Sequence, residues 1–134
     1  MMFADTFFYL ALLNKDDRAH TPALEFSKSG SVDILTTEYV LTEVGDALCF
    51  SPHRLKFRFL MEQLTSSASH VIVDASHELF VKGTELYYKR PDKDWSLTDC
   101  ISFVVMEDHS ITDALTGDHH FTQAGFRILF PDTP

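Results

Sequence analysis

The sequence predicts an α/β fold, specifically a three-layer α/β/α sandwich around a small and mainly parallel sheet. Short apolar runs of strand length alternate with longer segments of helical periodicity, and parallel strands require crossover connections of the length that helices supply. The chain has 134 residues, of which 45% are hydrophobic, and this is enough for one well-formed core. Its five glycines and five prolines are dispersed and mark no linker, so a single domain over residues 1–134 is expected.

The chain opens with a strand, two helices and a second strand. Residues 1–4 are apolar and predict a strand, and the helical patterns over residues 6–13 and about 22–28 predict two helices. A turn at Gly30 separates the second helix from the next predicted strand, over residues 32–36. These two strands are the first candidates for parallel neighbours.

Two further helices are predicted after the second strand. The first extends from the N-cap Thr37 to about Leu48, with an apolar stripe made of Val40, Val44, Ala47 and Leu48. The second has Pro52 in its first turn and ends near Leu64, with three side chains predicted to face inward, namely Leu55, Phe59 and Leu60.

The second half of the chain repeats the alternation. Residues 71–73 form a short β-branched run that predicts a buried strand, and the helical pattern of residues 76–89 ends before Pro91. Two helix-strand units complete the chain, at residues 96–108 with 114–116 and at residues 119–124 with 127–130.

Charge and cysteine content narrow the function. The chain has 11 Lys+Arg and 20 Asp+Glu, and the formal net charge of -9 argues against a protein that binds nucleic acid over a broad basic face. Either this charge serves solubility, or some acids are gathered at one place where a cation offsets their repulsion. Cys49 and Cys100 lie in apolar sequence and are predicted to be buried, reduced thiols of a cytoplasmic protein. The apolar residues 1–13 include Asp5 and fall short of the about 20 residues of a membrane span, so no membrane contact is expected.

Two acids follow predicted strands directly. Asp5 comes after the first strand, and Asp118 follows the strand at residues 114–116 after one glycine. Ligands of open parallel sheets bind outside the carboxyl ends of the strands, so these acids are expected at one edge. Alternatively, each is only the N-cap of the following helix. Asp74, after the strand at residues 71–73, occupies the same kind of position.

Two more acids lie in unusual surroundings. Glu43 lies beside the apolar stripe of its helix, although it is alternatively a solvated residue at the edge of the stripe. Asp99 is in the first turn of a helix that is apolar on nearly all sides. The Ser96 and Asp99 spacing also matches a capping box, so Asp99 is alternatively a structural cap. The pattern therefore predicts an acidic crevice without fixing its membership.

Four segments resemble the PIN-domain family, and more narrowly its VapC-type ribonucleases of toxin-antitoxin pairs. The segments are Phe-Ala-Asp-Thr-Phe-Phe-Tyr-Leu-Ala-Leu-Leu at residues 3–13, Thr-Thr-Glu-Tyr-Val-Leu-Thr-Glu-Val at 36–44, Asp-Trp-Ser-Leu-Thr-Asp-Cys-Ile-Ser-Phe at 94–103 and Ala-Leu-Thr-Gly-Asp-His-His-Phe at 114–121. The resemblance covers nearly the whole chain in the same order, and it is the combination of segments that is specific.

The resemblance implies a catalytic site. The family's four acids fall on Asp5, Glu43, Asp99 and Asp118, which would act as catalytic residues and metal ligands, and three hydroxyl residues would orient them, namely Thr6, Ser96 and Thr116. Oxygen ligands of this kind suit Mg²⁺, or Mn²⁺ as a substitute. The implied activity is Mg²⁺-dependent endoribonuclease cleavage of RNA. The implied partners are a small antitoxin protein and a second copy of the chain in a homodimer. Asp94 is interpreted as a loop residue and Asp74 as a cap.

Other patterns were weighed against this interpretation. Lys89, Arg90 and Lys93 are candidate contacts to RNA, whereas the adjacent His119 and His120 cannot easily face one metal ion and are interpreted as a surface and a helix-start residue. The chain lacks a Gly-rich phosphate loop, a nucleophile elbow and a cysteine pattern for zinc. Two alternatives remain, a receiver-like signalling domain with Asp74 as phosphoacceptor and a catalytically silent PIN-like binding module.

Overall fold

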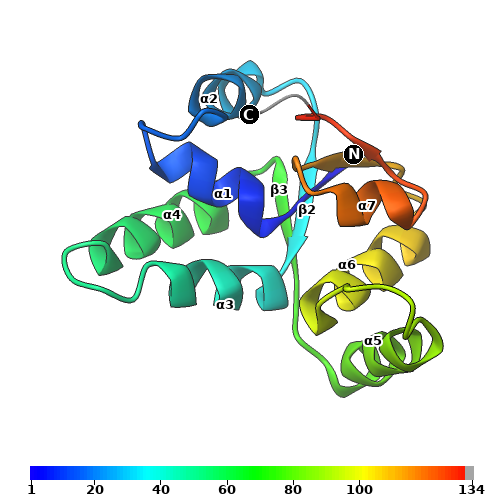
Figure 1. Cartoon of the computed structure of the whole chain (residues 1–134). Helices are drawn as coiled ribbons and strands as arrows, with labels where there is room; N and C mark the ends of the chain where they lie inside the picture. Colours follow the sequence, from blue (N-terminus) through cyan, green and yellow to red (C-terminus); the bar gives the residue numbers. More distant parts are fainter. Residues whose placement is uncertain (132–134) are drawn as a thin grey trace.

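A computed structural model of the chain describes residues 1–131, and its centre is a five-stranded parallel sheet (Figure 1). The strands are β1 (Met2–Ala4), β2 (Ile34–Thr37), β3 (His70–Val73), β4 (Asp113–Leu115) and β5 (Arg127–Ile128). Their order in the sheet is β3-β2-β1-β4-β5, with Phe3 of β1 paired to Leu35 of β2 and to Ala114 of β4. The chain therefore moves outward from β1 in one direction, returns, and continues in the other.

Helices cover both faces of this sheet. The first group is α1 (Thr6–Leu13), α2 (His20–Ser29), α3 (Glu38–Ala47) and α4 (Arg54–Ser66), and the second is α5 (His77–Lys89), α6 (Leu97–Asp108) and α7 (His119–Gln123). Figure 1 shows α1, α3 and α4 on one side of the sheet and α5, α6 and α7 on the other. This distribution is what right-handed crossovers produce when the direction of chain movement reverses after β3. The predicted three-layer α/β/α sandwich is confirmed.

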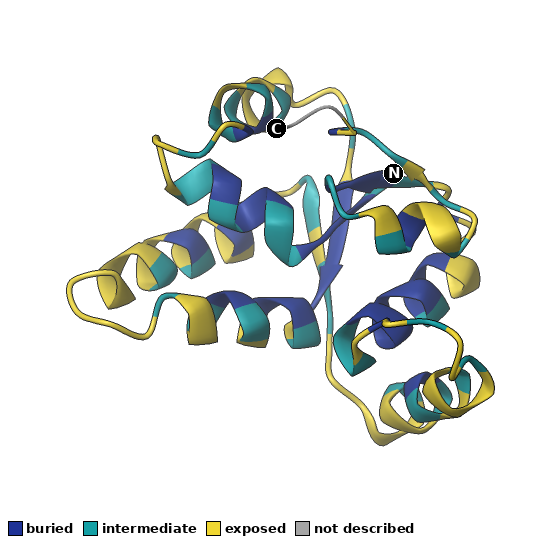
Figure 2. Cartoon of the chain, in the orientation of Figure 1, coloured by how far each residue is buried: buried dark blue, intermediate teal, exposed yellow. Residues whose placement is uncertain are grey.

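The core is concentrated in the central strands and in α6. Buried residues, dark blue in Figure 2, dominate both. On α6, the buried positions include Cys100, Ile101, Phe103 and Met106, which confirms that this helix is enclosed on nearly all sides. Phe103 meets Phe121 at 4.9 Å and Trp95 at 5.0 Å between ring centroids, in edge-to-face geometry. Such aromatic pairs add stability beyond the apolar area that they bury.

The prediction for α4 was wrong in its buried face. Leu55 and Phe59 are 70% and 59% exposed, whereas Leu60 and Leu64 are buried. Successive helical residues are turned by about 100°, so a helix with apolar side chains on several faces buries only one of them. Periodicity did not reveal which face meets α3 and the sheet. The helix also begins at Arg54 rather than at Pro52.

Smaller differences follow from position in the fold. Cys49 lies after the end of α3 and is exposed, so only Cys100 of the two thiols is buried. Ala47, the last residue of α3, is also exposed rather than part of a buried stripe. β3 is an edge strand and Val71 is 43% exposed, which corrects the expectation of a fully buried strand. The helix after residue 119 ends at Gln123, and β5 is only two residues long. Within residues 1–131, no helix is both long and apolar enough to cross a membrane.

Candidate functional site

The four predicted acids line one open pocket, here called the acidic pocket, with a volume of about 450 Å³. Its acidic members are Asp5, Glu43, Asp94, Asp99 and Asp118, and its other lining residues are Thr6, Phe7, Ser96, Gly117 and His120. In the described part of the chain, residues 1–131, no lysine or arginine forms a salt bridge with any of these acids. Within the described residues, the pocket is therefore a concentration of acids without a lysine or arginine partner.

Sheet topology brings Asp5 and Asp118 together. Asp5 follows β1, and Asp118 follows β4 after a short segment; β1 and β4 are neighbours in the sheet. The two strands are also where the chain changes its direction of movement across the sheet, which is the topological switch point of an open parallel sheet. Crevices at such points are the usual ligand sites of these folds.

Helices on opposite faces supply the other two predicted acids. Glu43 projects from α3 and Asp99 from the first turn of α6. Asp99 is also part of a capping box, since its Oδ2 accepts the Ser96 amide at 3.2 Å while Ser96 Oγ accepts the Asp99 amide at 3.0 Å. The capping interpretation was therefore correct, and it coexists with a position in the acidic pocket.

Hydroxyl groups hold the carboxylates in place. The Thr6 hydroxyl donates to Glu43 Oε1, and the Thr116 hydroxyl donates to Asp5 Oδ2 at 3.2 Å. Thr116 Oγ1 also accepts the backbone amide of Asp118 at 3.1 Å, so one threonine links the two strand-end acids. Together with the Ser96 cap, each hydroxyl residue singled out in the sequence contacts one of the acids.

Burial and mutual repulsion disfavour ionisation inside the pocket. Asp5 is only 5% exposed, and this burial is the main cause that raises its pKa to about 7. The Thr6 amide opposes the increase, and repulsion from Asp99, Glu43 and Asp118 adds to it. Burial also raises the pKa of Asp99, and the nearby Asp118 adds to it, whereas the Ser96 amide and His120 oppose the increase. A cation in the pocket would favour the charged forms of both acids.

His120 belongs to the pocket, and the sequence interpretation missed it. Its Nδ1 lies 3.1 Å from Asp99 Oδ2 and 3.5 Å from Asp118 Oδ1. The predicted surface position holds for His119, which is exposed, but His120 is turned inward at the start of α7. Asp118 caps this helix by accepting the His120 amide at 2.9 Å, and that contact places the ring over the acids. Its position two residues after Asp118 put it near the strand end, but spacing alone gave no direction for its ring.

Other candidate residues lie outside the acidic pocket. Asp74 is exposed after the edge strand β3 and does not line it, and the cap of α5 is Ser76, whose hydroxyl accepts the Leu79 amide. Lys89, Arg90 and Lys93 also lie outside it, at the end of α5 and in the following loop. Asp94, interpreted as a loop residue, is exposed and lines the rim.

The receiver-like alternative is contradicted by the topology. Receivers of the flavodoxin-like class have the strand order 2-1-3-4-5, whereas this sheet has the order 3-2-1-4-5. The acid that such a receiver would phosphorylate, Asp74, is also separated from the other acids.

The ligand types in the acidic pocket fit a divalent cation. Asp99, Asp118 and His120 each offer one ligand atom within 4.8 Å of the others, and the remaining donors are carboxylate oxygens. Clusters rich in carboxylate oxygen bind hard cations such as Mg²⁺ and Mn²⁺. The partly protonated state that burial imposes on Asp5 is consistent with a pocket completed by a cation.

The sheet order matches a PIN-like fold. The four acids lie at the ends of β1 and β4 and on α3 and α6, as the resemblance to that fold implies. No family model matches the chain. The chain is 28% identical over 137 residues to proteins of two Mycobacterium tuberculosis strains, CDC 1551 and H37Rv, described as "23S rRNA-specific endonuclease VapC20", with 98% of this chain and 100% of the relatives covered. The chain is therefore similar over nearly its whole length to a VapC-type endonuclease.

Solved structures share the fold of the chain. The crystal structure of VapC20 from Mycobacterium tuberculosis, described as a sarcin-ricin loop cleaving toxin, superposes with a TM-score of 0.82 at 25% identity and covers 94% of this chain and 96% of that one. VapBC2 from Rickettsia felis, bound to promoter DNA, shares the fold with a TM-score of 0.69 at 15% identity and covers 96% and 98% of the two chains. FitAcB from Neisseria gonorrhoeae shares it with a TM-score of 0.64 at 16% identity, covering 98% of both chains.

Proposed function

We propose that this protein is a Mg²⁺-dependent endoribonuclease and the toxin of a type II toxin-antitoxin pair. The observation that carries the proposal is the acidic pocket itself, in which Asp5, Glu43, Asp99 and Asp118 converge without a lysine or arginine partner in the described residues. The full-length similarity to relatives described as 23S rRNA-specific endonucleases supports RNA as the substrate. The sarcin-ricin loop named for the solved relative is accordingly the first RNA to test.

The four acids are the proposed metal ligands, with His120 as an additional donor beside Asp99 and Asp118. When bound, a Mg²⁺ or Mn²⁺ ion would activate a water molecule and offset the charge that develops on the scissile phosphate. The open face of the pocket leaves room for an RNA strand to approach the acids.

The remaining contacts position these groups. Thr116 directs Asp5, Thr6 directs Glu43, and the Ser96 cap directs Asp99, so each carboxylate has a fixed orientation before substrate arrives. His120 contacts both Asp99 and Asp118 and keeps these two acids close despite their like charge. Such supporting contacts typically change metal affinity or activity by about 10- to 100-fold when removed.

A small antitoxin protein is the proposed inhibitor, and a homodimer is the proposed assembly. Support for the antitoxin comes from the shared fold of VapBC2 and FitAcB, which are both described by the names of two-component pairs. An antitoxin that covers the acidic pocket would block both metal and RNA. Copurification with the product of an adjacent short gene tests the first partner, and light scattering of the purified chain tests the second.

Cleavage assays test the activity. The purified protein is incubated with an RNA hairpin that carries the sarcin-ricin loop, in Mg²⁺, in Mn²⁺ and in EDTA. Asp5→Asn and Asp99→Asn are expected to abolish cleavage. Asp74→Asn is the matched control, because it removes an exposed acid after β3 that does not line the pocket.

Three outcomes would contradict the proposal. Cleavage that persists in EDTA or in the Asp99→Asn variant excludes the metal-dependent site. Equal loss in Asp74→Asn and Asp99→Asn, with both variants folded by circular dichroism, contradicts the assignment of the activity to the acidic pocket. A wild-type protein that cleaves no RNA in either metal, yet binds an antitoxin, favours the catalytically silent PIN-like module.

A further inference from the structure

Two tyrosines at the end of α5 present their rings to solvent. Tyr88 is 75% exposed and Tyr87 is 49% exposed, and the two rings meet edge to face with centroids 6.2 Å apart. Single exposed aromatic residues are common, but two exposed rings in contact beside a pocket form a candidate binding surface, and edge-to-face contact leaves one ring face open for stacking.

These tyrosines border a second hollow, here called the tyrosine pocket, with a volume of about 540 Å³. Its lining includes Tyr87, Tyr88, Arg90, Lys93, Asp94 and Trp95. The volume lies within the range of about 300–1,000 Å³ that small-ligand pockets occupy. The tyrosine pocket and the acidic pocket share Asp94, and Trp95 directly precedes Ser96 of the acidic pocket. A single-stranded segment of RNA is therefore able to contact both pockets.

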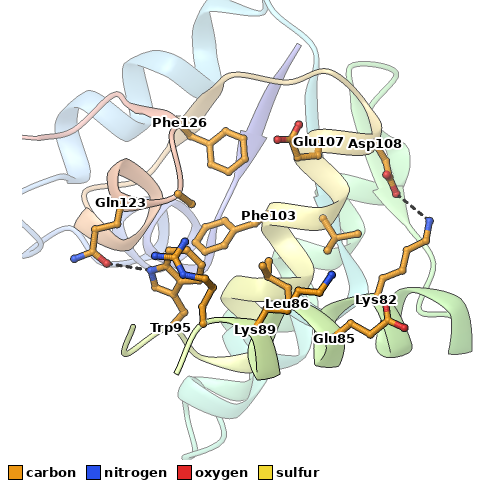
Figure 3. Close-up of a pocket in the computed structure, with 13 residues that line it drawn as sticks. Lys82, Glu85, Leu86, Lys89, Trp95, Phe103, Glu107, Asp108, Gln123 and Phe126 are labelled. Atoms are coloured by element: carbon orange, nitrogen blue, oxygen red, sulfur yellow. Dashed lines mark hydrogen bonds and ion pairs between the residues drawn. The ribbon is translucent and has the colours of Figure 1, made fainter. Parts of the chain in front are cut away.

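One wall of the tyrosine pocket is firmly held. The Trp95 indole donates to Gln123 at 3.0 Å, as Figure 3 shows, and packs edge to face against Phe103 at 5.0 Å. The Arg90 guanidinium lies 5.1 Å from the Trp95 ring and forms two hydrogen bonds to Asp92, at 3.0 and 2.9 Å. Arg90 therefore packs against Trp95 as part of this wall, and its guanidinium is already paired with Asp92.

Positive charge is available at the tyrosine pocket from Lys93. Within residues 1–131, Lys93 forms no salt bridge. In the neighbouring pocket of Figure 3, Lys89 also forms no salt bridge within the described residues, but three acids lie there, namely Glu85, Glu107 and Asp108, and Lys82 lies 3.7 Å from Asp108. The tyrosine pocket has two basic lining residues, Arg90 and Lys93, and one acid, Asp94, so a phosphate group is favoured there over the neighbouring pocket even though the net charge of the chain is -9.

We infer that Tyr88, supported by Tyr87 and Lys93, forms a nucleotide subsite that stacks one unpaired RNA base beside the scissile phosphate. The inference rests on the proposed ribonuclease function and specifies its substrate as RNA with an unstacked base near the cut. Exposed aromatic rings stack on splayed bases in single-stranded and loop RNA, and a lysine beside them binds the adjoining phosphate.

Binding measurements with the inactive Asp99→Asn variant test the subsite. The probe is the sarcin-ricin loop hairpin, used intact and as a series with a single abasic site at successive positions near the cut. Tyr88→Ala is expected to weaken binding of the intact hairpin by about 5- to 100-fold, in line with the stacking of one base. Tyr88→Phe retains the ring and should bind within about twofold of the parent. At one abasic position, the effect of Tyr88→Ala should disappear.

Two controls separate stacking from other effects. Phe80→Ala removes another exposed ring of α5 that does not line the tyrosine pocket, and it should leave binding unchanged. Lys93→Ala should lower the slope of log Kd against log salt by about 1, as expected for one phosphate contact. Lys82→Ala, which removes a lysine already paired with Glu78 and Asp108, should leave that slope unchanged.

Several results would overturn the inference. Equal loss in Tyr88→Phe and Tyr88→Ala, or the same effect of Tyr88→Ala on every abasic hairpin, excludes base stacking. Dissociation of a dimer by both Tyr88→Ala and Phe80→Ala assigns this face of α5 to a second copy of the chain. If the protein cleaves RNA but Tyr88→Ala does not weaken hairpin binding, the subsite alone is contradicted. If the hairpin binds in a Tyr88-dependent way but is never cleaved, the proposed function alone is contradicted. A protein that neither binds nor cleaves the hairpin contradicts both.

Discussion

Replacing Asp5 with asparagine should make the metal-free protein more stable at neutral and alkaline pH relative to the wild type. Burial, with repulsion from the neighbouring acids, raises the pKa of Asp5 from 3.8 to about 7. Because the pKa is raised in the folded state, the stability that the protonated group contributes is complete below pH 3.8 and is lost as the pH rises through about 7. Asparagine retains an acceptor for the Thr116 hydroxyl but carries no charge. The free energy of unfolding of the variant should therefore not fall over this pH range through position 5.

The magnitude follows from the raised pKa. One pKa unit corresponds to about 1.4 kcal/mol. As the pH rises from 5.5 to the folded pKa of Asp5, about 7, the free energy of unfolding of the wild type should therefore fall by about 2 kcal/mol. The difference in free energy of unfolding between Asp5→Asn and wild type should therefore move by about 2 kcal/mol in favour of the variant as the pH rises to 8.

Urea unfolding in EDTA measures this difference. Trp95 is the only tryptophan and is 6% exposed beside the acidic pocket, so its fluorescence reports unfolding of the relevant region. Asp74→Asn should parallel the wild type at every pH, because its carboxyl group is exposed. The reasoning is refuted if the Asp5→Asn and wild-type stabilities stay separated by a constant amount from pH 5.5 to 8. Saturating Mg²⁺ at pH 8 should reverse the order, because a cation that binds the folded wild type stabilises it by mass action.

Three further changes have defined outcomes. Gly83→Ala should cost about 1–3 kcal/mol in urea unfolding, because a Cβ there would lie 2.3 Å from Ile101 Cγ1 in the α5–α6 contact. Phe103→Ala should cost about 3–5 kcal/mol, since its ring is 2% exposed and packs against three other rings, and a loss below about 1 kcal/mol would contradict that packing. His120→Ala should weaken Mg²⁺ binding by about 10- to 100-fold in titration calorimetry, whereas the exposed His119→Ala should not, and equal effects would remove His120 from the site.

The strand-end acids were predictable because their placement depends on short-range pattern and sheet geometry. Asp5 and Asp118 each follow an apolar run, and parallel strands end at a common edge, so their proximity follows without knowledge of distant contacts. Asp99 was predictable for a different reason, since an acid in an enclosed apolar helix needs a partner or a role. The structure shows that it also caps α6, which spacing alone had left as an alternative.

Features that depend on packing between elements were not predictable. His120 faces Asp99 only because α7 packs against α6, and no spacing rule sets the direction of its ring. The same limit explains Leu55 and Phe59, since the face of α4 that is buried depends on where α3 and the sheet lie. Cys49 was expected to be buried because its neighbours are apolar, yet it follows the end of α3, where the chain leaves the core.

The central position of β1 has a consequence for biosynthesis. β1 comprises residues 2–4, but its partner β4 comprises residues 113–115, and Asp5 meets Thr116 across 111 positions of sequence. A chain emerging from the ribosome therefore holds Asp5 early and lacks the other wall of the acidic pocket until Asp118 has been added. A chain that stops before β4 would accordingly carry Asp5 and Glu43 but neither Thr116 nor Asp118, so it could not complete the acidic pocket.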